Sequence, residues 1–428
     1  MKKEIIVKAE RGRQKRQLWV IYTIVFLGFI GISMPYLIFP ALFLNPEFSI
    51  FPADASASTR ALFLGITLAV YPLGQFIGSP ILGALSDDYG RKQLLAGSLG
   101  VTAIGNLLTG VAVAGGHLGL LIVSRLLAGL MEGNVAIARA MAADIKTVSK
   151  HETFGRINVA SSIAYLIGPL VGGLMTDKRL WEGLTPSTPF FFICPLFFCL
   201  SVLSALVLKR SVIGPSVKAQ TVWQRINFIK RISALFSNKQ LKLLMLASTI
   251  FTLAVDIFYE FGPVYLTLKW TLGPAQLVLY NGVLCLGLAV GHGWLPALCS
   301  SRLSSRLLII GAMGGFALLL IGTVSVNSTF LMALLFTLSG LVIGLAVTLI
   351  TVKISDSVSD AVQGEVMGTQ LSLRVLGDGV ICLFGGALLI VSSKLILIIA
   401  AAISASAAVY YGFRHIPKKT QKLASGRD

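Results

Sequence analysis

The sequence predicts an all-α polytopic membrane protein, with twelve transmembrane helices arranged as two six-helix halves. Hydrophobic residues make up 55% of the 428-residue chain and charged residues only 13%, which is too little polar surface to cover a soluble globule. Apolar runs of about 20 residues, the length that crosses a bilayer core about 30 Å thick, recur along the chain. A basic, polar gap then divides these runs into two sets of six.

The predicted spans follow one another closely within each half. They lie near residues 16–40, 58–85, 92–113, 119–144, 155–176 and 188–208, and then near 242–266, 275–299, 306–326, 330–352, 364–391 and 393–413. The domain organisation is therefore an N-terminal half (1–208), a cytoplasmic basic linker (209–241) and a C-terminal half with a short basic tail (242–428). The linker either lies on the membrane surface as a short amphipathic helix or is a plain solvated segment.

The distribution of basic residues predicts the orientation of the chain. The formal net charge is +18, and 28 of the 36 Lys and Arg residues fall in the loops and tails on the side of the N-terminus. This bias follows the positive-inside rule and places both termini in the cytoplasm, in a plasma (inner) membrane. No basic globular segment is present to bind nucleic acid, so the expected partners are the lipid bilayer, protons and a small-molecule substrate.

A charged turn stands between the second and third apolar runs. Its sequence is Gly83-Ala84-Leu85-Ser86-Asp87-Asp88-Tyr89-Gly90-Arg91-Lys92. The glycine permits the turn, and the basic pair keeps it on the cytoplasmic side. The segment resembles the loop motif Gly-x-Leu-x-Asp-x-x-Gly-Arg-Lys of the major facilitator superfamily. That resemblance implies the major facilitator fold, a binding site between the halves near the membrane midplane, and a gating role for Asp87, Gly90 and Arg91.

Ionisable residues inside spans are functional candidates, because an unpaired charge at bilayer depth costs several kcal/mol. In the fourth span, Arg125, Glu132 and Arg139 recur every seven residues and form one polar stripe. They are candidates for charge relay or substrate contact, or they form a static link between helices. The segment Arg125-x-x-x-Gly129 resembles a motif of drug/proton antiporters that is associated with proton coupling. Asp144, at the end of this span, is expected to contribute to gating.

The fifth span contains Gly168-Pro169-Leu170-Val171-Gly172-Gly173. The proline bends the helix and the glycines permit either a bend or close packing. The segment is similar to the antiporter motif Gly-Pro-x-x-Gly-Gly of the superfamily, which implies that Gly168, Pro169, Gly172 and Gly173 take part in gating. The match is incomplete, since the family's preceding glycine is here Ala164.

The C-terminal half carries further intramembrane acids. Asp256 and Glu260 are four residues apart on one helical face, where joint ionisation is disfavoured, so one of them is expected to bind a proton. Tyr259 is a neighbouring donor. Arg374 and Asp378 have the same spacing and could neutralise each other.

Exporters that resemble this chain carry an acid in the first span, and no acid stands at the corresponding place here. The proton-coupling candidates are therefore Glu132, Asp256, Glu260 and Asp378, and the substrate or relay candidates are Arg125, Arg139, Arg374, Tyr259 and His292.

Other signals are absent from the sequence. It contains no phosphate-binding loop and no hydrolase or metalloprotease motif, so neither an enzyme nor an ATP-driven pump is expected. The five cysteines, Cys194, Cys199, Cys285, Cys299 and Cys382, lack the spacing of a zinc site. We therefore expect no metal. We also expect no cofactor, with the proton gradient as the energy source, and a monomeric protein.

The function that these features predict is secondary transport. Proton-coupled export of a small organic molecule by alternating access is the main prediction. A siderophore or anionic-metabolite transporter, exporting or importing, is the alternative, because arginines inside spans suit an anionic substrate. A membrane sensor without transport activity is a third reading, and it would need a signalling appendage that the sequence does not contain.

Overall fold

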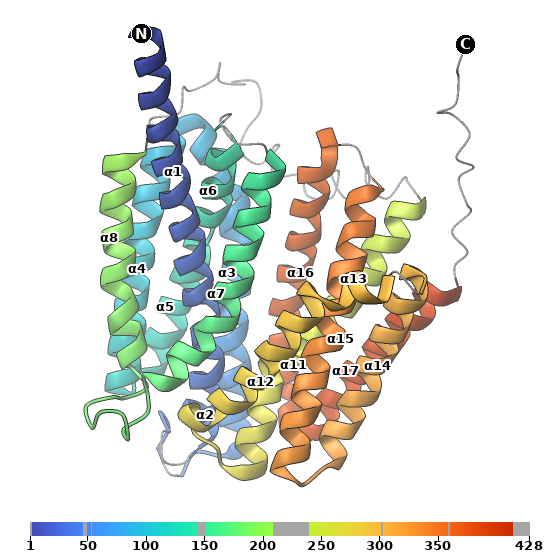
Figure 1. Ribbon diagram of the computed structural model, residues 1–428. Helices are drawn as coiled ribbons and strands as arrows, with labels where there is room; N and C mark the ends of the chain where they lie inside the picture. Colours follow the sequence, from blue (N-terminus) through green and yellow to red (C-terminus); the bar gives the residue numbers. More distant parts are fainter. Residues whose placement is uncertain are drawn as a thin grey trace, which may run out of the picture.

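The protein is a bundle of helices whose long axes run in roughly one direction (Figure 1). The structure is a computed structural model and describes residues 2–45, 49–52, 54–143, 145, 150–208, 239–300, 303–357 and 360–413. These residues form helices and connecting turns and contain no strand. The basic segment 209–238, with most of the predicted linker, lies outside them, and α11 begins at Lys239, inside the predicted linker. The predicted domain boundaries stay a prediction.

Each half contributes six membrane spans. The first half contains α1 (Lys2–Ser33), η1 (Met34–Leu37), α2 (Ile38–Leu44), α3 (Ala57–Tyr89), α4 (Arg91–Gly115), α5 (Leu118–Met131), α6 (Gly133–Ala143), α7 (Lys150–Leu174) and α8 (Thr188–Val207). The second contains α11 (Lys239–Trp270), α12 (Pro274–Gly293), α13 (Leu295–Ser300), α14 (Ser305–Ser325), α15 (Thr329–Asp356), α16 (Asp360–Leu389) and α17 (Ser393–Phe413). Eleven helices are long and apolar enough to span a bilayer, and α7 supplies a shorter apolar segment, Val159–Leu174.

Three predicted spans are interrupted, and each interruption has a local cause. The first span changes to a tighter helical turn at η1, where Pro35 lacks a backbone donor. The fourth is divided at Glu132 between α5 and α6, where the backbone forms i→i+3 hydrogen bonds on both sides of the break. The eighth ends at Gly293, and Pro296 stands in the first turn of the short α13. The predicted division of the last two spans is confirmed, since α16 ends at Leu389 and α17 begins at Ser393.

The surface of the bundle is apolar, as a bilayer requires. Large side chains such as Leu206 and Leu318 are about 75% exposed, and the same holds for Phe330. In water such a surface would drive aggregation, whereas lipid tails solvate it without cost. A helix satisfies most of its backbone polar groups internally, and that is why it is suited to cross lipid. The chain is therefore a multi-pass integral membrane protein.

The halves meet along α3 with α16 and along α7 with α12. Gly65 of α3 and Gly386 of α16 approach so closely that a Cβ on either would collide with the backbone of the other helix. Glycine is needed at both positions because the helices would otherwise have to separate. In Figure 1 the two halves lie closest at the end opposite to the start of α1, which we call the distal end, and diverge toward the other end.

A hydrogen bond joins the halves at the distal end. Asn45, which follows α2, donates from Nδ2 to the backbone carbonyl of Thr271, after α11, at 2.9 Å. Thr271 has a φ of 51°, which is unusual for a β-branched residue. Strained backbone of this kind persists only where surrounding contacts hold it, which favours a role for this contact in keeping the distal end closed.

Removing the Asn45 amide should loosen the distal end. A hydrogen bond contributes about 1 kcal/mol, so Asn45→Ala should change the ratio of distally closed to distally open molecules about fivefold. Electron–electron distance measurements between spin labels at Ser58 and Asn327, in a background without the native cysteines, would detect this shift. Thr271→Gly is the matched control, because it keeps the carbonyl acceptor and tolerates positive φ. Equal distance distributions in Asn45→Ala and the parent would show that the contact does not hold this end.

Candidate functional site

The buried acid of α11 pairs with an arginine of α16. Arg374 donates from Nε to both carboxylate oxygens of Asp256, at 3.1 and 3.0 Å, and from Nη2 to Oδ1 at 2.5 Å. The side chain of Asp256 is 4% exposed and that of Arg374 is 37% exposed. This bidentate contact is among the stronger ion-pair geometries. Arg374 thus pairs with a residue on another helix, and the local pair with Asp378 suggested by the sequence is not the one formed.

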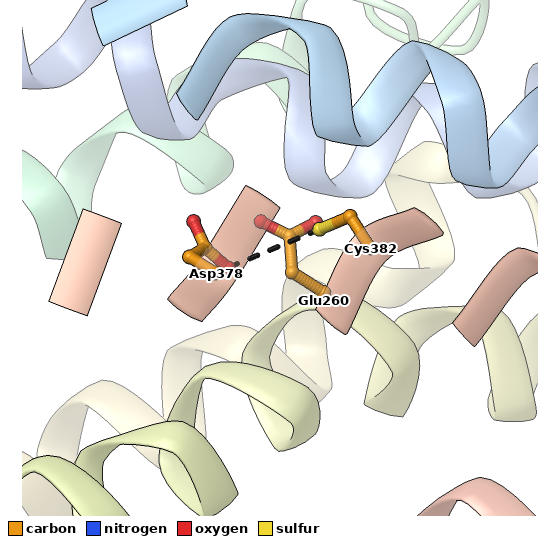
Figure 2. A group of neighbouring side chains, drawn as sticks. All are labelled: Glu260, Asp378 and Cys382. Atoms are coloured by element: carbon orange, nitrogen blue, oxygen red, sulfur yellow. Dashed lines mark hydrogen bonds between the residues drawn. The ribbon is translucent and has the colours of Figure 1, made fainter. Parts of the chain in front are cut away.

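The second acid of α11 lies with different partners. Glu260 meets Asp378 and Cys382 of α16, and one ligand-type atom from each residue lies within 4.8 Å of the others (Figure 2). Cys382 Sγ donates to Asp378 Oδ1 at 3.9 Å. Tyr36 of η1 also interacts with Glu260 and accepts a hydrogen bond from the Tyr165 hydroxyl at 2.9 Å. The two acids of α11 therefore have different partners: Asp256 is held by a cation, and Glu260 faces another acid.

Two members of the polar stripe in the fourth span, Arg125 and Glu132, contact aromatic side chains of other spans. The guanidinium of Arg125 lies over the rings of Tyr71 (4.3 Å) and Phe39 (5.5 Å). The Tyr71 hydroxyl donates to Glu132 Oε2 at 2.7 Å. Arg125 is only 3% exposed, and its Nε and Nη1 atoms have no hydrogen-bond partner. Cation–π contacts stabilise this buried charge but leave its N–H donors available to a ligand.

The remaining relay candidates are dispersed. Arg139 lies over the ring of Phe29, a residue of the first span, at 5.9 Å. His292 is exposed at the end of α12 and shares a 2.8 Å hydrogen bond with Thr348 of α15. Neither residue lines the cavities described next. Tyr259 does, and its ring lies 6.0 Å from that of Tyr165 across the two halves.

Two cavities lie between the halves and share the side chain of Tyr36. The polar cavity has a volume of about 360 Å³ including its opening, and the polar part of its lining includes Gln75, Arg125, Glu260 and Asp378. The aromatic cavity encloses about 510 Å³, and its lining includes Tyr165, Phe258, Tyr259, Tyr280, Asn281 and Phe336. A pocket with a large apolar part and a few convergent polar groups is the usual form of a small-molecule site.

The glycine motif of α7 is a packing motif in this conformation. A Cβ on Gly168 would collide with Ser33 of α1, one on Gly172 with Met34 of η1, and one on Gly173 with Val278 of α12. Pro169, between them, lines the aromatic cavity. The motif therefore brings α7 against the broken first span and the opposite half, and its role in gating stays a prediction.

The charged turn connects α3 to α4 and contacts the fourth span, and its role in gating stays a prediction. Gly90 has a φ of 99°, which favours glycine, and it separates α3 from α4. Arg91 Nη1 donates to the Ala140 carbonyl of α6 at 3.1 Å, so the turn contacts the end of the fourth span. The side chain of Asp87 and the whole of Asp144 lie outside the described residues.

Several site residues carry no sequence signal. Tyr36, Tyr71 and Tyr165 are ordinary aromatic residues of apolar runs, and only the folded chain brings them to buried charges. Cys382 could have been noticed because it follows Asp378 by one helical turn. The third member of this cluster, Glu260, comes from another helix, and a spacing motif within one segment cannot reveal it.

Fold and site together define a secondary transporter, with two helical halves around a buried polar and aromatic cavity. A sequence profile described as "Major Facilitator Superfamily" matches residues 21–382, and the chain belongs to that superfamily. The chain is 32% identical over 198 residues to tetracycline resistance protein, class H, of Pasteurella multocida, covering 46% of this chain and 45% of the relative. It is 28% identical over 227 residues to multidrug resistance protein 2 of Bacillus subtilis (strain 168), covering 52% of each chain.

These matches span about half of the length of the curated relatives, whereas likeness to solved structures extends over nearly the whole chain. The human organic anion transporter MFSD10 (TETRAN) superposes with a TM-score of 0.64 at 16% identity, over 93% of this chain and 99% of that one. The nucleoside transporter NupG gives a TM-score of 0.67 at 15% identity, over 92% and 98%. At such identities the likeness establishes the fold alone.

The Arg374–Asp256 pair should contribute measurably to stability. Breaking a buried pair costs about 3–5 kcal/mol, and the partial exposure of Arg374 lowers our expectation to about 2 kcal/mol. Free energies of unfolding from SDS titration of Arg374→Ala, Asp256→Ala and the double variant should reveal a coupling of this size. The same cycle with Asp378→Ala in place of Asp256→Ala is the control and should be closer to additive. The reverse order of couplings would mean that Arg374 serves Asp378 instead.

Proposed function

We propose that the protein exports a small organic molecule in exchange for protons, by alternating access of the cavities to the two membrane faces. It would act as a monomer in the plasma (inner) membrane, with both termini cytoplasmic and the proton gradient as its energy source. The excess of Lys and Arg on the side of the N-terminus supports this orientation. The printed names of the tetracycline and multidrug resistance relatives support export of organic compounds.

The observation that carries proton coupling is the pair Glu260 and Asp378 at the wall of the polar cavity. Two carboxylates this close in a low-dielectric site resist joint ionisation, so a proton held by the pair is readily exchanged with solvent or substrate. Asp256 lacks this property because Arg374 already balances its charge. Glu132 accepts a hydrogen bond from Tyr71 and is a second place where a proton can reside. Of the predicted coupling residues, we therefore assign the main role to Glu260 and Asp378.

Transport of an anionic substrate is the alternative, and one observation favours it. Arg125 lines the polar cavity with two N–H-bearing nitrogens that have no hydrogen-bond partner. A substrate carboxylate could accept a hydrogen bond from one of these nitrogens, while an aromatic or apolar body occupied the adjoining aromatic cavity. Since Arg374 is neutralised by Asp256, this arrangement suits a single acidic group better than a polycarboxylate.

Replacing Glu260 or Asp378 with the matching amide should impair proton-driven transport while leaving substrate binding intact. In sealed vesicles with an imposed proton gradient, Glu260→Gln and Asp378→Asn should each slow transport of the probes tetracycline and ethidium about tenfold or more, equivalent to at least about 1.4 kcal/mol. Exchange of probe across the membrane without a gradient should persist, because the cavity is intact. Asp54→Asn, at an exposed acid in the loop before α3, is the matched control and should retain coupled transport. Full gradient-driven transport by both acid-pair variants would remove this pair from the mechanism.

The role of Arg125 is open to a separate measurement. If its planar guanidinium binds a carboxylate, Arg125→Lys should weaken binding of an acidic probe almost as much as Arg125→Ala, by about tenfold or more, because lysine lacks the paired donors. Arg139→Lys is the control, since Arg139 stands outside the cavities. Wild-type affinity in Arg125→Lys, measured by equilibrium binding to the purified protein, would reduce Arg125 to a point charge and count against the anionic alternative.

A further inference from the structure

Glu260, Asp378 and Cys382 form a compact set of ligand-type side chains. Asp378 and Cys382 are one helical turn apart on α16, and Glu260 faces them from α11 (Figure 2). Their ligand atoms all lie within 4.8 Å of one another, and the Sγ–Oδ1 distance is 3.9 Å. Ligand atoms around a tetrahedral metal ion are separated by about 3.4–3.8 Å when bond lengths are about 2.1 Å to oxygen and 2.3 Å to sulfur. Only small side-chain adjustments would therefore be needed to enclose an ion.

The set lacks an internal counter-charge. Glu260 is 4% exposed, and its Oε2 atom has no hydrogen-bond partner. The nearest arginine on α16, Arg374, is already bound by Asp256. In the part of the chain that the structure describes, no Lys, Arg or His forms a salt bridge with Glu260 or Asp378. A buried carboxylate oxygen of this kind is costly unless something binds it.

We propose that these three side chains bind a thiophilic divalent cation such as Zn²⁺. Two carboxylate oxygens and one thiolate match the donor set of zinc, whereas Mg²⁺ and Ca²⁺ prefer oxygen alone. Glu260 and Asp378 also line the polar cavity, so a fourth coordination position would face that cavity and the ion would have a path of entry. Protons are the competing occupants, but they would not require a sulfur ligand beside the two acids.

The proposal departs from the expectation that the chain binds no metal. That expectation rested on the absence of closely spaced cysteines and histidines. Here the ligands come from two helices that are 118 residues apart at Glu260 and Asp378, a separation that spacing motifs do not detect. The proposal stands apart from drug export, although a bound ion would occupy the acids to which we assign proton exchange.

Cobalt substitution tests the site directly. Tag-free, chelator-treated protein in detergent should bind Co²⁺ and develop the near-ultraviolet absorption of a thiolate–cobalt bond, which Zn²⁺ should then remove. Cys382→Ser should abolish this band, whereas the matched control Cys285→Ser, at a half-buried cysteine of α12, should keep it. Glu260→Gln should weaken Zn²⁺ binding at least about tenfold, since even the loss of an outer-shell partner costs 10–100-fold. Size-exclusion profiles and thermal unfolding would verify that each variant is folded.

The wild type supplies a readout that needs no variant. X-ray absorption at the zinc edge should show one sulfur ligand together with oxygen ligands. No binding of Co²⁺ or Zn²⁺, a coordination sphere without sulfur, or a cobalt band that persists in Cys382→Ser would each overturn the proposal and leave protons as the occupants.

Failure of this proposal and failure of the proposed function give different results. Proton-driven export by metal-free wild type, without cobalt binding, rejects the metal site and retains the transporter mechanism. A sulfur-ligated ion in a protein that moves neither probe under a proton gradient retains the site and rejects that mechanism.

Discussion

The cost of burying charge in a membrane governs the interior of this protein. Lipid supplies neither counterions nor hydrogen bonds, so every ionisable side chain in the bundle must find its partner inside the protein. The structure meets this requirement in three ways: a bidentate ion pair for Asp256, aromatic faces and a tyrosine hydroxyl for the Arg125 and Glu132 stripe, and a cluster of acids with a thiol around Glu260. Only in the Asp256–Arg374 pair is each charge balanced by the other. The other two retain unpartnered atoms, and both border the polar cavity through Arg125 and Glu260.

The fold could be predicted from the sequence because hydropathy acts over short distances. Apolar runs of bilayer length, separated by turns such as Asp87–Arg91, determine the number of spans whatever their packing. The breaks were harder to foresee. Pro35 and Pro296 give a strong local signal, whereas the division at Glu132 has only a weaker one, the poor helix formers Gly133 and Asn134. There the tertiary contact with Tyr71 accompanies a change in the backbone that local propensity does not specify.

The candidate site was only half predictable, and the reason is geometric. Spacing of four residues correctly places Asp256 and Glu260 on adjacent turns of one helix, but it suggests that they act on each other. Their partners are instead set by the rotation of α16, which presents Arg374 to the first acid and Asp378 to the second. Helices α11 and α16 each carry an i, i+4 pair, and the members of these pairs contact residues of the other helix rather than each other. No reading of either helix alone could distinguish this arrangement from two local pairs.

The position of these charges relative to the two halves links electrostatics to movement. Arg125 belongs to the first half and Glu260 to the second, yet both line one cavity, and Tyr36 of the broken first span stands between the polar and aromatic cavities. In the alternating-access mechanism that we propose, rocking of one half against the other would change the separation between Arg125 and the acids, because each is fixed to its own half by packing. If the acids carry the exchanged proton, as we propose, its loss would strengthen their attraction to Arg125 and favour the conformation in which the halves approach there. A proton or cation on the acids would weaken that attraction. Under this proposal, the occupancy of the acids and the conformation of the bundle are coupled in one equilibrium.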